Sequence, residues 1–142
     1  MALQAMATRP EAWGWHLLGL INPVVVIAGN LLGGPFVTAG VTYMLGIGPM
    51  LDVVLGKSAL LQRPSRDSGR PFEVMLFAHA LLQLLAVGTL LLLAAGGTSV
   101  WIVVFASVST GINSGASGLI VAHELGHRRK KSFSWWIAQL NL

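Results

Sequence analysis

The sequence predicts an all-α integral membrane fold with about four transmembrane helices. Of the 142 residues, 54% are hydrophobic and only 10% are charged, whereas an ordinary soluble domain carries about 25% charged residues. The mean hydropathy is +0.72. The apolar residues are gathered in long blocks rather than in alternating or amphipathic patterns. Together these observations exclude a water-soluble fold of this size and predict a membrane protein.

Four apolar blocks have the length of a membrane span, which needs about 20 mostly apolar residues. We expect the spans at residues 13–32, 35–55, 72–95 and 100–122. A glycine-rich turn, "GNLLGGP", separates the first two blocks, and a short polar turn, "GGTS", joins the last two. Residues 56–71, "GKSALLQRPSRDSGRP", form an extended hydrophilic loop between the second and third blocks.

The lysines and arginines predict how the spans are oriented. If the N-terminus is cytoplasmic, four spans also place loop 56–71 and the residues after 122 in the cytoplasm. All nine basic residues then lie on that side: Arg9, Lys57, Arg63, Arg66, Arg70, Arg128, Arg129, Lys130 and Lys131. This is the positive-inside distribution. Although the pI is near 10.4, there is no basic face with interleaved aromatic residues, and we expect no nucleic-acid partner.

The motif "HELGH", residues 123–127, carries the chemical signal of the chain. Cysteine is absent, which excludes disulfides, thiolate zinc sites and iron–sulfur clusters and leaves histidine and carboxylate as metal ligands. His123 and His127 are four residues apart, so on a helix their imidazoles share one face. Neutral imidazole suits zinc, iron or copper. We therefore predict that His123 and His127 bind a metal at the cytoplasmic end of the fourth span.

Two histidines do not complete a metal site. A catalytic zinc takes three protein ligands and a water, and a dinuclear iron site takes more. The remaining histidines are His16, near the cytoplasmic start of the first span, and His79, inside the third span. We expect His16 to be an interface residue and His79 to make a hydrogen bond between helices.

Two enzyme classes use such a histidine pair. In zinc metalloproteases, including the intramembrane site-2 type, the two histidines of HExxH bind zinc and the glutamate, here Glu124, acts as general base on the bound water. In membrane oxygenases, the pair is the first of several histidine clusters that build a dinuclear iron site at the cytoplasmic face. The motif alone leaves both alternatives open.

Three longer stretches resemble the membrane-bound alkane 1-monooxygenases, whose superfamily includes xylene monooxygenases and integral-membrane fatty acid desaturases. They are "GIGPMLDVVLGKS" (46–58), "RPFEVMLFAHALLQLL" (70–85) and "SGLIVAHELGHRRKKSFSWWIAQLNL" (117–142). The third is the most specific, because it resembles the first histidine box of that family, the basic run after it and the tryptophan-containing helix that follows. A site-2-type protease is expected to have small and apolar residues where this chain has the basic run 128–131.

The resemblance implies an activity and its requirements. A full-length enzyme of this kind is a multi-pass protein of the bacterial inner (plasma) membrane, and it inserts oxygen from dioxygen into an alkane or a similar apolar substrate. Its cofactor is dinuclear iron, and a rubredoxin- or ferredoxin-like partner delivers electrons at the cytoplasmic face. The family's further histidine boxes, E-H-x-x-G-H-H and R-H-S-x-H-H, do not occur here. We therefore expect residues 1–142 to be the N-terminal part of a hydroxylase domain, inactive by itself.

Two acidic residues are candidates for supporting a metal-bound histidine. Asp52 lies in an apolar run near the cytoplasmic end of the second span, where it either orients a ligand, as carboxylates commonly do, or pairs with Lys57. In the oxygenase interpretation Glu124 supports a ligand through a hydrogen bond.

A pattern of small residues lies just before the histidine motif. Gly111 with Gly115, and Ser114 with Gly118, repeat at an interval of four residues. Such spacing lets helix backbones approach closely in a membrane. We expect both pairs to pack against a neighbouring helix.

Overall fold

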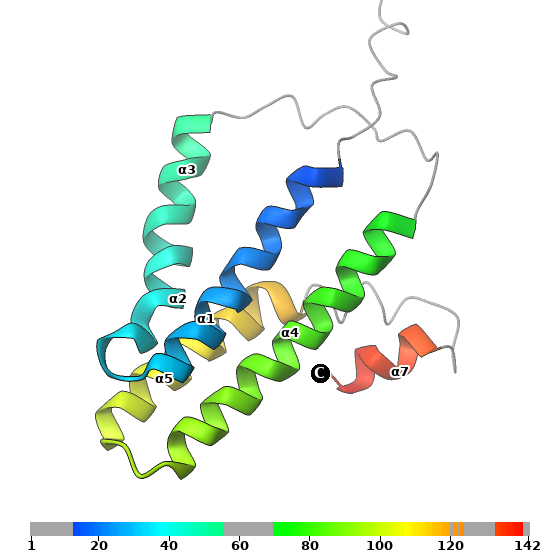
Figure 1. Ribbon diagram of the computed structural model, residues 1–142. Coiled ribbons are helices and arrows are strands. Elements are labelled where there is room, and N and C mark those ends of the chain that lie inside the picture. The colour runs from blue at the N-terminus through cyan, green and yellow to red at the C-terminus, as the bar shows by residue number, and fades with distance from the viewer. Residues whose placement is uncertain (1–12, 56–69, 120, 122, 124–132, 141–142) are drawn as a thin grey trace, which may run out of the picture.

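The computed structural model describes residues 13–55, 70–119, 121, 123 and 133–140, and every element in these ranges is helical (Figure 1). The predicted all-α fold class is therefore confirmed for this part of the chain. The first rod consists of a 3-10 segment, η1 (Trp13–Leu20), that continues directly into α1 (Ile21–Leu32). The chain reverses at Gly33 and Gly34, whose φ angles of 69° and 53° favour glycine.

The second rod begins immediately after this reversal and changes its helical type along its length. It consists of the 3-10 segment η2 (Gly34–Thr38), α2 (Ala39–Thr42), the π-helical segment η3 (Tyr43–Ile47) and α3 (Gly48–Leu55). The part formed by η2 and α2 packs against both α1 and α5.

Two long helices follow residue 70. They are α4 (Arg70–Ala95) and α5 (Val100–Asn113), and α5 continues into the π-helical segment η4 (Ser114–Gly118). The turn between them uses Gly97, with a φ of 74°. This turn and the reversal after α1 lie at the same end of the bundle, whereas the start of α4 and the end of α3 lie at the other (Figure 1). A short helix, α7 (Phe133–Leu140), packs on α4.

Two of the described helices are long and apolar enough to cross a membrane. Residues Glu73–Ala95 form one stretch of 23 residues with a mean hydropathy of 2.2, and Val100–Gly118 form another of 19 residues with a mean hydropathy of 1.3. These stretches correspond to the third and fourth expected spans. The apolar helix Leu17–Leu32 is shorter.

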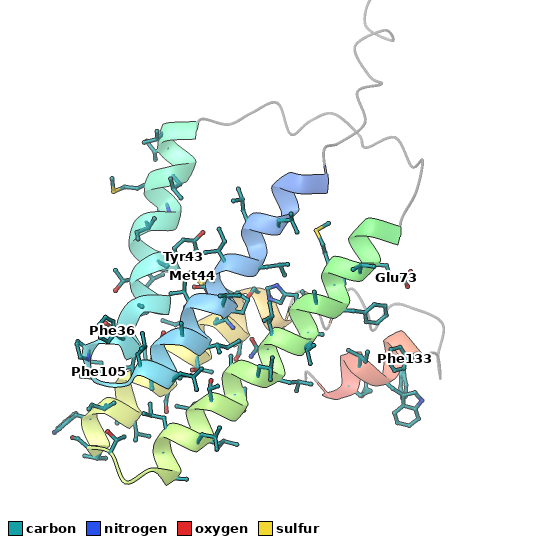
Figure 2. All side chains as sticks on the ribbon, in the orientation of Figure 1. Phe36, Tyr43, Met44, Glu73, Phe105 and Phe133 are labelled. Atoms are coloured by element: carbon teal, nitrogen blue, oxygen red, sulfur yellow. The ribbon has the colours of Figure 1, made fainter. Side chains whose placement is uncertain are left out.

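Polar side chains lie in the interior of the bundle beside valines and alanines, and large apolar side chains cover its outside. The buried polar residues are Asn22, Asn30, His79, Gln83, Ser109, Thr110 and Asn113. On the outside, Phe36 and Phe105 (labelled in Figure 2) are 55% and 53% exposed, and Leu92 is 68% exposed. This distribution is the reverse of that in a soluble domain, and it suits a surrounding medium of lipid.

An amide network joins α1, α4 and α5 through Asn113. The side-chain nitrogen of Asn22 donates to Asn113 Oδ1 over 2.9 Å, and Asn113 Nδ2 donates to Gln83 Oε1 over 2.6 Å. Gln83 Nε2 in turn donates to the hydroxyl oxygen of Ser114. Three helices therefore meet at a chain of hydrogen bonds whose members are distant in sequence.

A second polar contact lies nearer the turn end of the bundle. The side-chain nitrogen of Asn30 has the Ala86 carbonyl oxygen and the Thr110 hydroxyl at 3.2 Å, and the Thr89 hydroxyl at 3.3 Å. Its two hydrogens are shared among these acceptors. Asn30 thus joins α1, α4 and α5 a second time, nearer the turn end of the bundle than Asn113 does.

Glycine allows the second rod to approach α1 and α5 closely. A Cβ atom on Gly40 would lie 2.2 Å from Val26 Cγ2 and 2.7 Å from Ser109 Oγ. The same Ser109 hydroxyl accepts a hydrogen bond from the Val41 backbone N–H over 3.2 Å. Gly40 therefore occupies a position where no larger residue fits without displacement.

Of the two small-residue pairs before the histidine motif, only one packs against a neighbouring helix among the described residues. A Cβ on Gly118 would lie 3.0 Å from Gln83 Cδ, and Ser114 accepts a hydrogen bond from the same glutamine. By contrast, a Cβ on Gly111 or Gly115 would meet nothing within 4 Å in the part of the chain that the structure describes. The expected close packing is correct for Ser114 and Gly118 and wrong for Gly111 and Gly115, because the amide network turns the Ser114 face toward α4.

Substitution of Asn113 tests the amide network. Asn113→Leu removes the partner of the Gln83 side-chain oxygen and leaves the Asn22 amide only its 3.6 Å contact with Met44 Sδ. We expect it to lower the free energy of unfolding by about 1–2 kcal/mol. Ser107→Leu, on the exposed side of the same helix, is the matched control and should change it by less than about 0.5 kcal/mol. Unfolding by sodium dodecyl sulfate in mixed micelles measures both. Equal effects of the two substitutions would show that the network does not stabilise the bundle.

Candidate functional site

His123 lies at the end of the helix that carries α5 and η4. The backbone is helical at Leu119, Val121 and His123. Val121 is buried against Ala80 of α4, whereas the His123 side chain is exposed. Two residues on a helix point about 200° apart, so His123 is directed away from α4. The imidazole is therefore on the outer side of the helix end and not in the polar interior.

The other candidates are described less fully or not at all. Glu124 and His127 lie outside the described residues, so their predicted roles stay predictions. The backbone of Asp52 belongs to α3, and its side chain is not described. Figure 1 shows α3 apart from α4 and α7, with the bundle between them. The described part of the chain thus does not bring α3 to the end of the helix that carries His123.

His79 belongs to the interior of the bundle. It is 6% exposed and lies one turn before Gln83 on α4, the residue that contacts Asn113 and Ser114. Its Nε2 has no hydrogen-bond partner within the part of the chain described here. Among the described residues, this nitrogen therefore does not form the expected hydrogen bond between helices. The side chain of His16 is outside the described residues.

The described residues do not contain a complete metal site. No three histidine or acidic side chains gather among them. An exposed imidazole at a helix end is chemically suitable as a ligand of iron or zinc, so His123 fits a ligand role as one member of a larger set. Any metal bound at this motif needs donors in addition to His123.

An open groove on another part of the surface has apolar walls. It measures about 470 Å³ and lies between α1 and the second rod. Its lining residues are Val25, Pro35, Phe36, Thr38, Ala39, Thr42, Tyr43 and Ile47. None of them is a candidate metal ligand. The sequence pattern did not predict this groove. Pro35 and the glycines at 46 and 48 nevertheless mark the irregular helix that borders it.

Tryptophan and phenylalanine side chains accompany the short helix α7. The rings of Trp135 and Trp136 are in edge-to-face contact, with centroids 4.9 Å apart. Phe133, at the start of α7, contacts Phe77 of α4 with ring centroids 5.8 Å apart (Figure 2). The segment that follows the histidine motif is therefore attached to α4.

No protein-family model, curated protein or solved structure matches this chain. The resemblance carried by the three stretches of sequence quoted above and by the histidine motif therefore stays a prediction.

Replacement of single histidines separates the candidate ligands from the interior histidine. With Co²⁺ as the probe and its visible absorption as the measurement, we expect His123→Ala and His127→Ala each to weaken binding at least tenfold, because each removes a nitrogen donor. His79→Ala should leave Co²⁺ affinity unchanged and reduce stability instead, because this side chain is buried in the bundle. A loss of Co²⁺ binding in His79→Ala, with helix content preserved, would contradict this assignment.

Proposed function

We propose that this chain is part of a dinuclear-iron membrane monooxygenase that hydroxylates alkanes or similar apolar substrates with dioxygen. The observation that carries the proposal is the pairing of a histidine box and a basic run, residues 123–131, with a helical bundle whose outside is apolar. The exposed His123 at the end of this bundle supports a ligand role that is completed by donors beyond the motif.

Four membrane spans are part of the proposal. Besides α4 and α5, the 8-residue η1 and 12-residue α1 form one continuous rod, and the second rod runs without a break from Gly34 to Leu55. Each rod has about the length that a span requires, and each packs against α5 or α4. By the positive-inside rule, the proposal puts the N-terminus, loop 56–71 and the histidine motif on the cytoplasmic side of a bacterial inner membrane.

The proposed reaction needs groups from the chain and from its iron cofactor. His123 and His127 would hold iron, and Asp52 and Glu124 would orient the ligands through hydrogen bonds. Iron, when bound, supplies the activation of dioxygen. The apolar outside of the bundle gives an alkane access from the lipid phase, and a rubredoxin- or ferredoxin-like donor would deliver electrons at the cytoplasmic face. With two histidines of the set, residues 1–142 alone are expected to be inactive.

Any coding sequence that continues beyond codon 142 distinguishes the oxygenase from the intramembrane zinc protease. We expect it to encode E-H-x-x-G-H-H, because a dinuclear iron centre needs more imidazoles than the two of the HELGH motif. A downstream membrane segment of the Asn-Pro-Asp-Gly type would instead assign Glu124 as the general base of a protease. Sequencing of this region tests this expectation, and iron and zinc analysis of the full-length protein identifies the bound metal.

The four-span arrangement is testable because the chain contains no cysteine. Thr98→Cys introduces a thiol in the turn between α4 and α5, and Ser58→Cys introduces one in the loop between the second and third spans. A membrane-impermeant maleimide added to intact spheroplasts should label the cysteine at 98 and spare the cysteine at 58. Both should react after the membrane is opened. Labelling of the two positions from the same side would rule out this topology.

A further inference from the structure

His79 and Asn22 each bury a polar atom that has no hydrogen-bond partner among the described residues. The two atoms are His79 Nε2 and Asn22 Oδ1, and the side chains that carry them are 6% and 8% exposed. An unpaired polar atom is costly wherever water is excluded, and the cost is greatest inside a membrane. Both atoms therefore need a hydrogen-bonding partner.

The packing of α1 on α4 puts these two residues at the same level of the bundle. The two helices run in the same direction, because each of them ends at the turn end (Figure 1). Asn30 of α1 contacts Ala86 and Thr89 of α4. Asn22 lies two turns before Asn30, about 12 Å along the helix axis. The same step back along α4 leads from that contact to the turn that contains His79.

The two residues also lie on the helix faces that meet. His79, Gln83 and Ala86 are spaced four and three residues apart, so they form one stripe on α4, and all three are buried. On α1, Asn22 and Asn30 are eight residues apart on one face and are both buried. The two unpaired atoms thus belong to facing sides of one interface between helices.

The amide network determines which atom of Asn22 is left unpaired. Asn113 donates its side-chain nitrogen to Gln83 and presents its oxygen to Asn22. Asn22 meets that oxygen with its own nitrogen, which also has Met44 Sδ at 3.6 Å. The Asn22 oxygen is consequently left as an acceptor. His79 Nε2 accepts or donates a hydrogen bond according to the tautomer of the imidazole.

The surrounding side chains favour a neutral ligand. None of the buried polar residues in the described part of the chain is an aspartate or a glutamate. A metal or ammonium ion at this position would therefore be a buried charge without a counter-charge, which is unfavourable. A water molecule can donate to Asn22 Oδ1 and can pair with His79 Nε2 in either tautomer. Buried water typically makes such bonds to polar groups that have no other partner.

We propose that one water molecule is bound inside the bundle between Asn22 of α1 and His79 of α4. It completes the hydrogen bonding of both side chains and links the two helices without a direct contact between these residues. The water site is separate from the histidine motif and does not depend on iron. Asn30 Oδ1, which is also unpaired among the described residues, lies about 12 Å farther along α1 and is not part of this site.

Solid-state NMR of the 142-residue chain in lipid bilayers tests for the water directly. The chain and the lipids are deuterated at carbon, and the histidine rings carry ¹⁵N. A proton–nitrogen correlation spectrum with a short contact time then records which exchangeable protons lie beside each ring nitrogen. We expect a water cross-peak at Nε2 of His79, identified by its loss in His79→Phe. Absence of a water cross-peak at this nitrogen would overturn the proposal.

Removal of the Asn22 oxygen tests the second partner of the water. In Asn22→Leu we expect the water cross-peak of His79 to weaken at least about fivefold, because the water keeps only one of its two partners. Asn30→Leu is the matched control: it makes the same change at another buried asparagine of α1 and should keep the cross-peak. Circular dichroism compares the helix content of the two variants.

The two spectra test different parts of the proposal. An unchanged cross-peak in Asn22→Leu, or an equal loss in Asn30→Leu, would overturn the assignment of Asn22 as a partner. The spectrum of the unaltered chain decides whether His79 contacts a buried water, even where a variant does not fold.

Discussion

The fold depends on hydrogen bonds between side-chain amides inside an apolar bundle. Lipid offers no partner to a buried amide, and apolar side chains gain little from facing another helix rather than lipid. In the proposed membrane setting, the pairing of Asn22, Asn113 and Gln83 therefore decides which helix faces meet. The large apolar residues are left to cover the outside, which is where they are found.

Close backbone approach makes these hydrogen bonds possible. Gly40 lets α2 lie against Val26 of α1 and Ser109 of α5, and Gly118 leaves room for the side chain of Gln83. A side chain at Gly40 would hold α2 away from α1 and α5, and one at Gly118 would displace the Gln83 side chain from its present position. The small residues and the amides thus act together, and neither set alone specifies the packing.

The sequence predicts the helices better than it predicts their contacts. The length and hydropathy of the apolar blocks predict the helical rods and the reversal near Gly33, because the rods and the reversal both follow from local composition. The contact between Asn22 and Asn113 joins residues 91 positions apart, and hydropathy carries no information about such pairing. Single amides within otherwise apolar blocks are the signal that marks them. The same limit explains why Gly111 and Gly115 were expected to pack: spacing shows that two residues share a face but not which face is covered.

The direction of His123 follows from the π-helical segment η4. On a regular helix Val121 would point about 80° away from Asn113, and the two side chains would face different parts of the bundle. A π segment adds one residue to a turn, which rotates all later residues back by about 100° and brings Val121 close to the Asn113 direction. His123 then points nearly opposite to the amide network, in agreement with a buried Val121 and an exposed His123. The hydroxyls of Ser114 and Ser117, which donate to the carbonyl oxygens of Thr110 and Asn113, accompany this segment. One irregular turn therefore separates the polar interior, which holds the bundle together, from the face that presents the proposed metal ligand.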